Sequence, residues 1–359
     1  MKILLTNIYQ AENTGDSAIW KSMMSHLNRD LGNCEFDILS QITTEWDMNE
    51  LSNFNINVIL NHIPDIEELK QYDAVISQGG GYMIGDGMAT YLELFKNAQS
   101  LGKPTFFATQ TFVGPINDET KLLLVEVLNN ATFVAPREQV TYDFLVECGV
   151  NSDKLTLLPD AVFSIDPIIY DRKKIPKDSV KIGIRSYSAS EEYLNEIAKF
   201  ADMVSEALGK VVLIPVGHGT DRNDLVGCEY IASKMQHKSI IIDEKVNANE
   251  LKDILKDGIL ITDRYHGAVY ALSMCTAVVP LTPDIDFKMP GLLDLVDYKY
   301  KTIFNQNVKA EELFNATCEV WRNRDGIRND LSDKVAFLYA KSTLVYKNIV
   351  ESLNETNRK

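Results

Sequence analysis

Short apolar runs alternate with stretches of helical spacing along most of the chain. The runs that predict strands in the first half span residues 2–6, 36–39, 57–60, 74–77, 105–108 and 132–135. Several are followed by a polar turn and then by a stretch of helical spacing, as over 89–101 and 118–128. Strands that alternate with helices are typical of a parallel sheet covered by helices on both faces.

This alternation breaks between Asp166 and Asp178, where prolines and a charged run interrupt it. Four further apolar runs follow, at 181–185, 211–214, 239–242 and 258–261. The chain has 359 residues, and a single core usually stops growing at roughly 250–300 residues. We therefore predict an α/β protein with two Rossmann-like domains, 1–168 and 178–330, joined by this linker.

Apolar residues at helical spacing over 332–353 predict a final helix, which we assign to 331–359 and expect to pack back across the protein. Two doubly wound domains that face each other leave a cleft lined by the carboxyl ends of both sheets. Ligands of open α/β sheets bind at those strand ends. Motifs that directly follow strands therefore carry the functional interpretation.

The chain has a formal net charge of −15. An acidic surface repels nucleic acid and anionic membranes, so we expect no nucleic-acid partner and at most peripheral membrane contact. Apolar runs fall short of the roughly 18–20 residues that a bilayer requires. The five cysteines are scattered and form no C-x-x-C pair, which fits free thiols in a cytoplasmic protein and no zinc site.

The loop after the first predicted strand contains Asn13, Gly15 and Asp16. Gly15 permits a tight turn, and Asp16 stands where a helix N-cap is expected. A capped helix start explains the pattern, and so does a loop in which Asp16 binds a sugar hydroxyl. The turn lacks the G-x-G-x-x-G spacing of a dinucleotide site, which disfavours a nicotinamide-dependent oxidoreductase.

Three glycines, Gly79–Gly81, follow the predicted strand 74–77. Glycines at such a place let the backbone approach a ligand closely and present N–H groups to it. A flexible turn explains them equally well. The Lys-Ser/Thr ending of a nucleotide P-loop is missing.

Single polar residues follow several other strands. Arg137 can bind a carboxylate or phosphate with two hydrogen bonds, or it can form an ion pair with Glu138. Asp160 can orient a ligand or form a turn. His218 lies in a loop that either faces a ligand or caps a helix, and a lone lysine such as Lys288 is usually solvated.

The densest polar cluster is Asp263-Arg264-Tyr265-His266-Gly267, between an apolar strand and a predicted helix. A fixed cation and an imidazole lie two residues apart at the start of that helix. This is the composition of an anion site with an acid–base group beside it. A structural Arg–His pair explains poorly why so many polar groups follow a buried strand.

Taken together, these motifs resemble the polysaccharide pyruvyl transferase family over most of the chain, from Asn13 to about Leu295. The matching pieces are Asn13-x-Gly15-Asp16-x-Ala18-Ile19, Gly79-Gly80-Gly81, Arg137 with Thr141 and Gly149, Pro159-Asp160, Arg264-Tyr265-His266-Gly267, and Lys288. That family has two Rossmann-type domains of the GT-B kind. The resemblance therefore implies a GT-B-like fold.

The resemblance also implies transfer of a pyruvyl group from phosphoenolpyruvate to two hydroxyls of one sugar, without a metal or cofactor. The acceptor would be a polysaccharide or cell-wall glycan precursor, often lipid-linked. By position, Arg137 and Arg264 would hold the donor in catalysis, Lys288 would help to bind it, and His266 would be the general acid. Substrate contacts are expected from Asn13, Gly15, Asp16, Gly80, Gly81, Gln110, Asp160 and His218.

The segment 108–115 departs from the family's glycine-rich stretch, because Thr109 and Thr111 replace glycines. Glu138 and Thr141 replace the usual Asp and Ser. These changes leave two alternatives open: a GT-B glycosyltransferase that uses a nucleotide-sugar donor, and a catalytically idle paralogue that binds a sugar. Homo-oligomerisation stays open as well.

Overall fold

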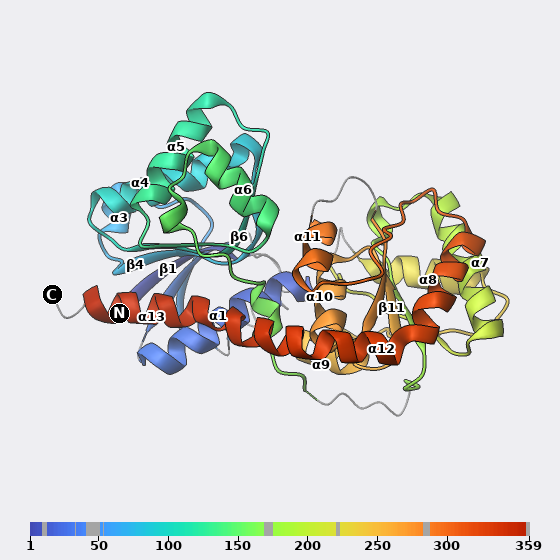
Figure 1. Cartoon of the computed structure of the whole chain (residues 1–359). Coiled ribbons are helices and arrows are strands. Elements are labelled where there is room, and N and C mark those ends of the chain that lie inside the picture. The colour runs from blue at the N-terminus through green and yellow to red at the C-terminus, as the bar shows by residue number, and fades with distance from the viewer. Residues whose placement is uncertain are drawn as a thin grey trace. The chain divides into compact units, whose positions relative to one another are not determined.

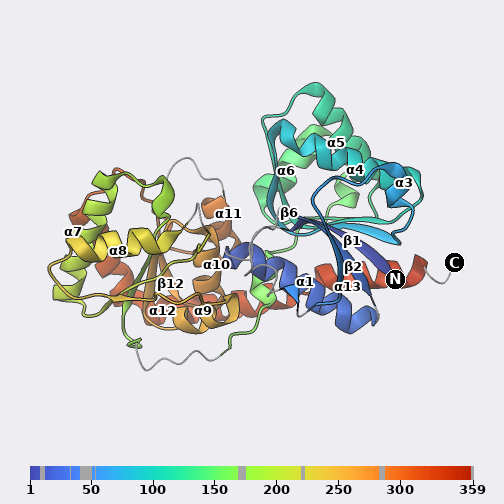
Figure 2. The ribbon, with the colours of Figure 1, turned by 180° about the vertical axis from the view of Figure 1, so that it is seen from behind.

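The computed structural model describes residues 1–8, 13–32, 34–40, 51–52, 54–168, 175–219, 223–282 and 288–356. Contacts divide the chain into two compact units, drawn in Figure 1 and from behind in Figure 2. Unit 1 comprises Met1–Ala11, Asp16–Ser164 and Ala340–Lys359, and unit 2 comprises Glu12–Gly15 and Ile165–Tyr339. The boundary falls at Ser164, close to the predicted 168. The charged run 171–174 of the predicted linker lies outside the described residues.

The described part of unit 1 forms a seven-stranded parallel sheet. Its strands are β1 (Lys2–Ile8), β2 (Glu35–Ser40), β3 (Ile56–Leu60), β4 (Ala74–Ser77), β5 (Gly80–Ile84), β6 (Thr105–Val113) and β7 (Phe133–Pro136). Their order is β3-β2-β1-β4-β6, and β6 also pairs with β5 and β7. The strand order reverses between β1 and β4, which pair with Leu5 opposite Ile76. We call this reversal the switch point of unit 1.

Helices cover both faces of this sheet (Figure 1). They are α1 (Thr14–Leu31), α3 (Ile66–Leu69), α4 (Ala89–Ser100), α5 (Asp118–Asn130), α6 (Gln139–Cys148) and α13 (Leu344–Thr356). Figures 1 and 2 both show α13 beside α1, where Tyr346 stacks on His26 with ring centroids 4.3 Å apart. The buried Tyr346 hydroxyl donates to Ser22 Oγ over 3.0 Å.

The described part of unit 2 forms a five-stranded parallel sheet in the order β10-β9-β8-β11-β12. The strands are β8 (Val180–Gly183), β9 (Val211–Leu213), β10 (Ile240–Ile241), β11 (Ile259–Thr262) and β12 (Ala277–Pro280). Its helices are α7 (Glu191–Ala207), α8 (Asp224–Lys234), α9 (Ala248–Leu255), α10 (Tyr265–Ser273), α11 (Lys288–Leu295) and α12 (Ala310–Ser342). The strand order reverses between β8 and β11, where Gly183 lies opposite Thr262. This reversal is the switch point of unit 2.

The two parallel, doubly wound sheets confirm the predicted fold class, and three local predictions need correction. The single helix predicted over 332–353 is instead α12 followed by α13. Gly80 and Gly81 begin strand β5 rather than an open turn, because β5 pairs with the second half of β6. Asp16 does not cap α1, which begins two residues earlier, where Asn13 Oδ1 accepts from the N–H of Gly15 over 3.2 Å.

Candidate active site

The carboxyl ends of β8 and β11 are tied together at the switch point of unit 2. Thr262 Oγ1 donates to the carbonyl of Gly183 over 2.6 Å, and Asp263 Oδ1 accepts from the N–H of Arg185 over 2.7 Å. Asp263 is buried, and its second oxygen, Oδ2, has no hydrogen-bond partner. Burial raises the pKa of Asp263 to about 6. Asp263, to which the sequence alone assigned no role, therefore joins the ends of β8 and β11.

Arg264 caps the same strand end with a guanidinium that is held on two sides. One terminal nitrogen donates to Asp224 Oδ1, and the ring of Tyr187 lies 5.2 Å from the guanidinium carbon. Burial alone would lower the pKa of Arg264, but the Asp224 carboxylate raises it, so the side chain stays a cation. Within the described ranges, Nε of Arg264 has no hydrogen-bond partner, and the same is true of Nε of Arg185, which follows β8.

Asp224, the first residue of α8, fixes the loop after β9 as well as Arg264. Its Oδ2 accepts from the N–H groups of Val216 and Gly217, over 3.2 and 2.8 Å. His218 follows directly and is 8% exposed. Burial lowers the pKa of His218 to about 4, so this imidazole is neutral at pH 7. Thr220 and Asp221, the rest of the predicted loop motif, lie outside the described residues.

His266 lies in the first turn of α10 and contacts Gly15 in the first turn of α1. A Cβ on Gly15 would lie 1.9 Å from His266 Nδ1, so only glycine leaves room for this ring. Thr14 Oγ1 donates to the carbonyl of Val216 over 2.9 Å, and the Tyr270 hydroxyl donates to the carbonyl of Thr14 over 2.7 Å. Residues 13–15 therefore belong to unit 2, not to the first domain as predicted.

Lys288 is the first residue of α11, and this helix packs against α10 (Figure 1). The side chain is half-buried rather than fully solvated. The two preceding residues of its sequence motif, Asp286 and Phe287, lie outside the described residues. Lys288 is thus placed in the same unit as Arg264 and His266.

Arg137 lies in unit 1, where two carboxylates already balance its charge. Its Nε donates to Glu138 over 2.5 Å and to Thr111 Oγ1 over 2.8 Å, and its Nη1 donates to Asp160 over 2.7 Å. All four residues have almost no exposed surface. The Thr111 hydroxyl that replaces a family glycine and the longer Glu138 carboxylate contact each other directly. Both departures from the family pattern therefore belong to one buried polar cluster.

Gln110 and Gly80 lie near this cluster at the carboxyl edge of unit 1. Gln110 is buried, with its Nε2 directed at Ser77 Oγ over 3.4 Å. Gly80 has φ +132°, and a Cβ there would lie 2.2 Å from the ring of Tyr82. Gly81 and Asp16 are half-buried. The residues predicted to bind substrate thus fall into two sets, one in each unit.

Sequence reasoning missed Asp224, Arg185 and Tyr187. The signal that singled out Arg137 and Arg264, a cation directly after an apolar strand, was also present at Arg185. Asp224 gave no such signal, because it reaches Arg264 from another helix 40 residues away in sequence. Tyr187 lies in the short 3-10 helix η5 (Ser186–Ser188) after β8, where no motif marks it.

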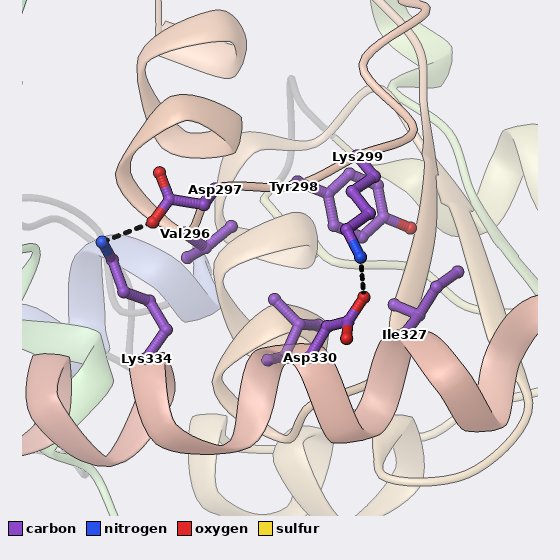
Figure 3. Close-up of a pocket in the computed structure, with 8 residues that line it drawn as sticks. Val296, Asp297, Tyr298, Lys299, Ile327, Asp330 and Lys334 are labelled. Carbon is purple, nitrogen blue, oxygen red and sulfur yellow. Dashed lines mark hydrogen bonds and ion pairs between the residues drawn. The ribbon is translucent and has the colours of Figure 1, made fainter.

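A partly open pocket of about 250 Å³ also lies in unit 2, between α12 and the segment after α11 (Figure 3). Its charged residues pair with one another across it, Lys299 with Asp330 at 2.5 Å and Lys334 with Asp297 at 2.7 Å. Its lining residues include none of the strand-end groups described above. The pocket is therefore separate from the switch point.

Across the described ranges, His, Cys, Asp and Glu side chains do not gather in groups of three or more that could hold a metal ion. The helices within those ranges include none with the length and apolar content to pass through a bilayer.

A comparison with known proteins identifies the family to which this chain belongs. The family model described as polysaccharide pyruvyl transferase matches residues 13–285. The chain belongs to this family. The match includes all the predicted site residues except Lys288, which follows it by three positions. A search of curated proteins finds no match.

Solved structures with the same fold as this pyruvyl transferase family member include a UDP-GlcNAc 2-epimerase, a glycosyltransferase and a protein in complex with UDP. UDP-GlcNAc 2-epimerase from Neisseria meningitidis, bound to UDP-GlcNAc, has a TM-score of 0.64 and 14% identity, covering 99% of this chain and 100% of that one. A glycosyltransferase from Rickettsia africae ESF-5 has a TM-score of 0.62 and 15% identity, covering 99% and 98%. S. aureus MnaA with UDP has a TM-score of 0.61 and 14% identity, covering 92% of this chain and 90% of that one. At these identities the likeness supports the GT-B-like fold alone.

Proposed function

We propose that this chain transfers the pyruvyl group of phosphoenolpyruvate to two hydroxyls of one sugar in a polysaccharide or cell-wall glycan precursor. The products are a cyclic ketal and phosphate. The observation that carries the proposal is the pair of arginine Nε–H groups, on Arg185 and Arg264, at the switch point of unit 2, for which the described part of the chain supplies no hydrogen-bond partner. Phosphoenolpyruvate carries a carboxylate and a phosphate, and guanidinium groups bind both.

The donor would bind at the ends of β8 and β11. Asp224 holds the Arg264 guanidinium by a terminal nitrogen, which leaves Nε to face the donor. The start of α10 adds backbone N–H groups and the positive end of a helix dipole. Lys288 in the adjacent helix is a third cation for the same anion. Several fixed cations can thus neutralise a donor of this charge.

His266 would be the proton donor. Its proton goes to the methylene carbon of phosphoenolpyruvate, and the first sugar hydroxyl attacks the central carbon as that carbon becomes cationic. The second hydroxyl then displaces phosphate, which leaves with the bridging oxygen, and the hydroxyl protons pass to the buffer or back to His266. A lost general acid costs roughly 10²–10⁴ in rate. The packing of Gly15 against the ring would hold it in place.

Arg137 takes a different part in this proposal. Because Glu138 and Asp160 already neutralise it in a buried cluster, it would position the strand ends of unit 1 rather than contact the donor. Asp160 shares this role, since its Oδ1 also accepts from the N–H of Val162 over 2.9 Å. The acceptor sugar would be bound by unit 1.

The direct test is product formation by His266→Gln and by a control, His237→Gln, which changes an exposed histidine of unit 2. Wild type and control are incubated with phosphoenolpyruvate and a panel of nucleotide-linked sugars, and ketal methyl signals and released phosphate are measured by NMR. Both should form ketal, while His266→Gln should bind phosphoenolpyruvate and form almost none. Normal turnover by His266→Gln would refute its role, and failure of wild type to bind phosphoenolpyruvate would refute the function.

The alternative is a glycosyltransferase that uses a nucleotide-sugar donor. It is favoured by one observation, that solved structures with this fold are bound to UDP or UDP-GlcNAc. A thermal-shift comparison separates the two. A ligand that binds only the folded protein raises the melting temperature, so phosphoenolpyruvate should stabilise a pyruvyl transferase and UDP a glycosyltransferase.

A further inference from the structure

Among the described residues, four side-chain oxygens at the carboxyl ends of β1, β4 and β6 have no hydrogen-bond partner. They are Thr6 Oγ1, Asn7 Oδ1, Gln78 Oε1 and Gln110 Oε1. Their residues are at most 1% exposed. Buried polar atoms are nearly always paired, and each exception needs an explanation such as a ligand or an ion. Here the exceptions lie on neighbouring strands at the switch point of unit 1.

The three amides among them are oriented in the same way. Asn7 Nδ2 donates to Ser77 Oγ over 2.9 Å, Gln110 Nε2 donates to the same oxygen over 3.4 Å, and Gln78 Nε2 donates to the carbonyl of Asn7. Each amide is thus anchored through its nitrogen, while its oxygen is left to accept a hydrogen bond. Asn7 also has φ +61°, a strained backbone conformation that is frequent at binding sites.

The surroundings of these amides suit a sugar. Tyr82, a half-exposed aromatic residue of β5, places its ring against Gly80, two residues after Gln78. Sugars bind to aromatic faces and to amide groups that fix their hydroxyls. Because the oxygens have almost no exposed surface, a ring-sized ligand requires a neighbouring side chain to move.

The charge at this edge disfavours an anion. The N–H of Arg137 donates to the carbonyl of Gln110, which places the Arg137 cluster next to the amides. That cluster pairs the Arg137 guanidinium with two carboxylates, Glu138 and Asp160, so its cation is already balanced and does not attract an anionic ligand. Amide oxygens accept hydrogen bonds from hydroxyls and repel a carboxylate. The expected ligand is neutral and rich in hydroxyls.

We propose that Asn7, Gln78 and Gln110 form a subsite for a neutral sugar ring and exclude uronic acids. As the acceptor subsite of a pyruvyl transferase, it rests on the proposed function; as a sugar site, it does not. The amide oxygens accept hydrogen bonds from the sugar's hydroxyls.

The experiment uses saturation-transfer NMR on the full chain with methyl glycosides of neutral hexoses and N-acetylhexosamines, and with methyl glucuronide. Gln110→Met and Gln78→Met each replace an amide by an apolar chain of similar length. The control is Gln139→Met, at an exposed position of α6. The neutral glycosides should bind wild type and control, and about ten-fold more weakly to the two variants, as expected for a lost buried hydrogen bond. Methyl glucuronide should not bind.

The melting temperature gives a second measurement, which separates the loss of a sugar contact from a folding defect. Because Gln110 leaves an oxygen unpaired in the free protein, Gln110→Met should melt no lower than wild type. The proposal is overturned if no neutral glycoside binds, if binding survives both variants, or if methyl glucuronide binds as well. Phosphoenolpyruvate binding is measured in parallel by calorimetry. Its loss with sugar binding intact would refute the pyruvyl transfer alone, and the opposite result would refute this subsite alone.

Discussion

Units 1 and 2 have sheets with the same strand order around the switch point, yet the strands end in different chemistry. The strand ends of unit 1 carry neutral amides and Arg137, whose charge Glu138 and Asp160 balance. The strand ends of unit 2 carry Arg264 and Arg185, each with an Nε that has no hydrogen-bond partner among the described residues. Under the two proposals above, one architecture provides a site for a neutral ligand and a site for an anion, and the difference lies in the strand-end residues.

The two arginines show why position after a strand does not decide function. Arg137 is enclosed by two carboxylates and a threonine hydroxyl. Arg264 shares one carboxylate, Asp224, with backbone N–H groups of the β9 loop. The Arg137 guanidinium therefore stabilises the fold. The Arg264 guanidinium is held in place, and its Nε–H stays available to donate a hydrogen bond to a ligand.

The strongest test of this comparison replaces each arginine by methionine. Arg137→Met leaves two buried carboxylates without their cation, which should lower the free energy of unfolding by about 3–5 kcal/mol. Arg264→Met leaves Asp224 bound to backbone N–H groups, and should cost about 1–3 kcal/mol. Urea unfolding followed by circular dichroism measures both.

The same two variants should also differ in their affinity for phosphoenolpyruvate. Phosphoenolpyruvate affinity, measured by calorimetry, should fall sharply in Arg264→Met and stay near wild type in folded Arg137→Met. If Arg137→Met were stable and no longer bound phosphoenolpyruvate, Arg137 would have to contact the phosphoenolpyruvate directly. Arg29→Met, an exposed arginine on α1, is the control for both measurements.

The second test uses the two titrating groups of unit 2. Folded Asp263 has a pKa of about 6, so it keeps a proton that the unfolded chain loses near pH 4, and its contribution to stability is lost as pH rises between these values. Folded His218 has a pKa of about 4, so its contribution is lost as pH falls from about 6.5. The two slopes have opposite sign and largely offset each other in wild type.

Replacing either Asp263 or His218 should reveal the pH dependence of stability that the other group contributes. Stability of Asp263→Asn should rise with pH from about 4 to about 6.5, relative to wild type, by about 3 kcal/mol, and that of His218→Gln should fall by a similar amount. Urea unfolding across this pH range measures the slopes. Parallel curves for all three proteins would show that neither group has the stated environment.

Much of the fold was predictable because the strands of parallel sheets are short apolar runs. Strand β4 is the predicted 74–77, and α4 and α5 start where their spacing placed them. Strand β5 was missed, because Gly80-Gly81-Tyr82-Met83-Ile84 is extended only through pairing with β6. The final helix was misjudged because apolar spacing continues through the break at Thr343.

The site was predictable only where its residues are consecutive. Arg264 and His266 stand out as polar residues between a buried strand and a helix. The contact of Gly15 with His266 joins residues 251 positions apart, and no local pattern reports it. The same holds for the amides Asn7, Gln78 and Gln110, which become neighbours only through the strand order of unit 1.

That long-range contact gives the third test. Gly15→Ala would place a Cβ 1.9 Å from His266 Nδ1, so the imidazole must move. A displacement of about 1 Å at a catalytic group can cost about 10²-fold in rate, so we expect kcat to fall by this order with KM for phosphoenolpyruvate little changed. The control is Gly326→Ala, in α12, where an added Cβ meets nothing within 4 Å. Equal kcat values for the two variants would remove His266 from the mechanism.

The smallest expected effect compares two buried threonine hydroxyls, Thr111 on β6 of unit 1 and Thr262 at the end of β11 in unit 2. Thr111 Oγ1 donates to Glu138 and accepts from Arg137, while Thr262 Oγ1 donates to Gly183 and accepts from the N–H of Arg264 over 3.0 Å. Valine keeps the shape and removes the hydroxyl, so each Thr→Val change should cost about 1–2 kcal/mol of stability. Only Thr262→Val should also raise KM for phosphoenolpyruvate, because Thr262 positions the backbone of a residue proposed to bind the donor. Equal effects on KM would mean that the two strand ends serve the donor alike, which would contradict the division of ligands between the units.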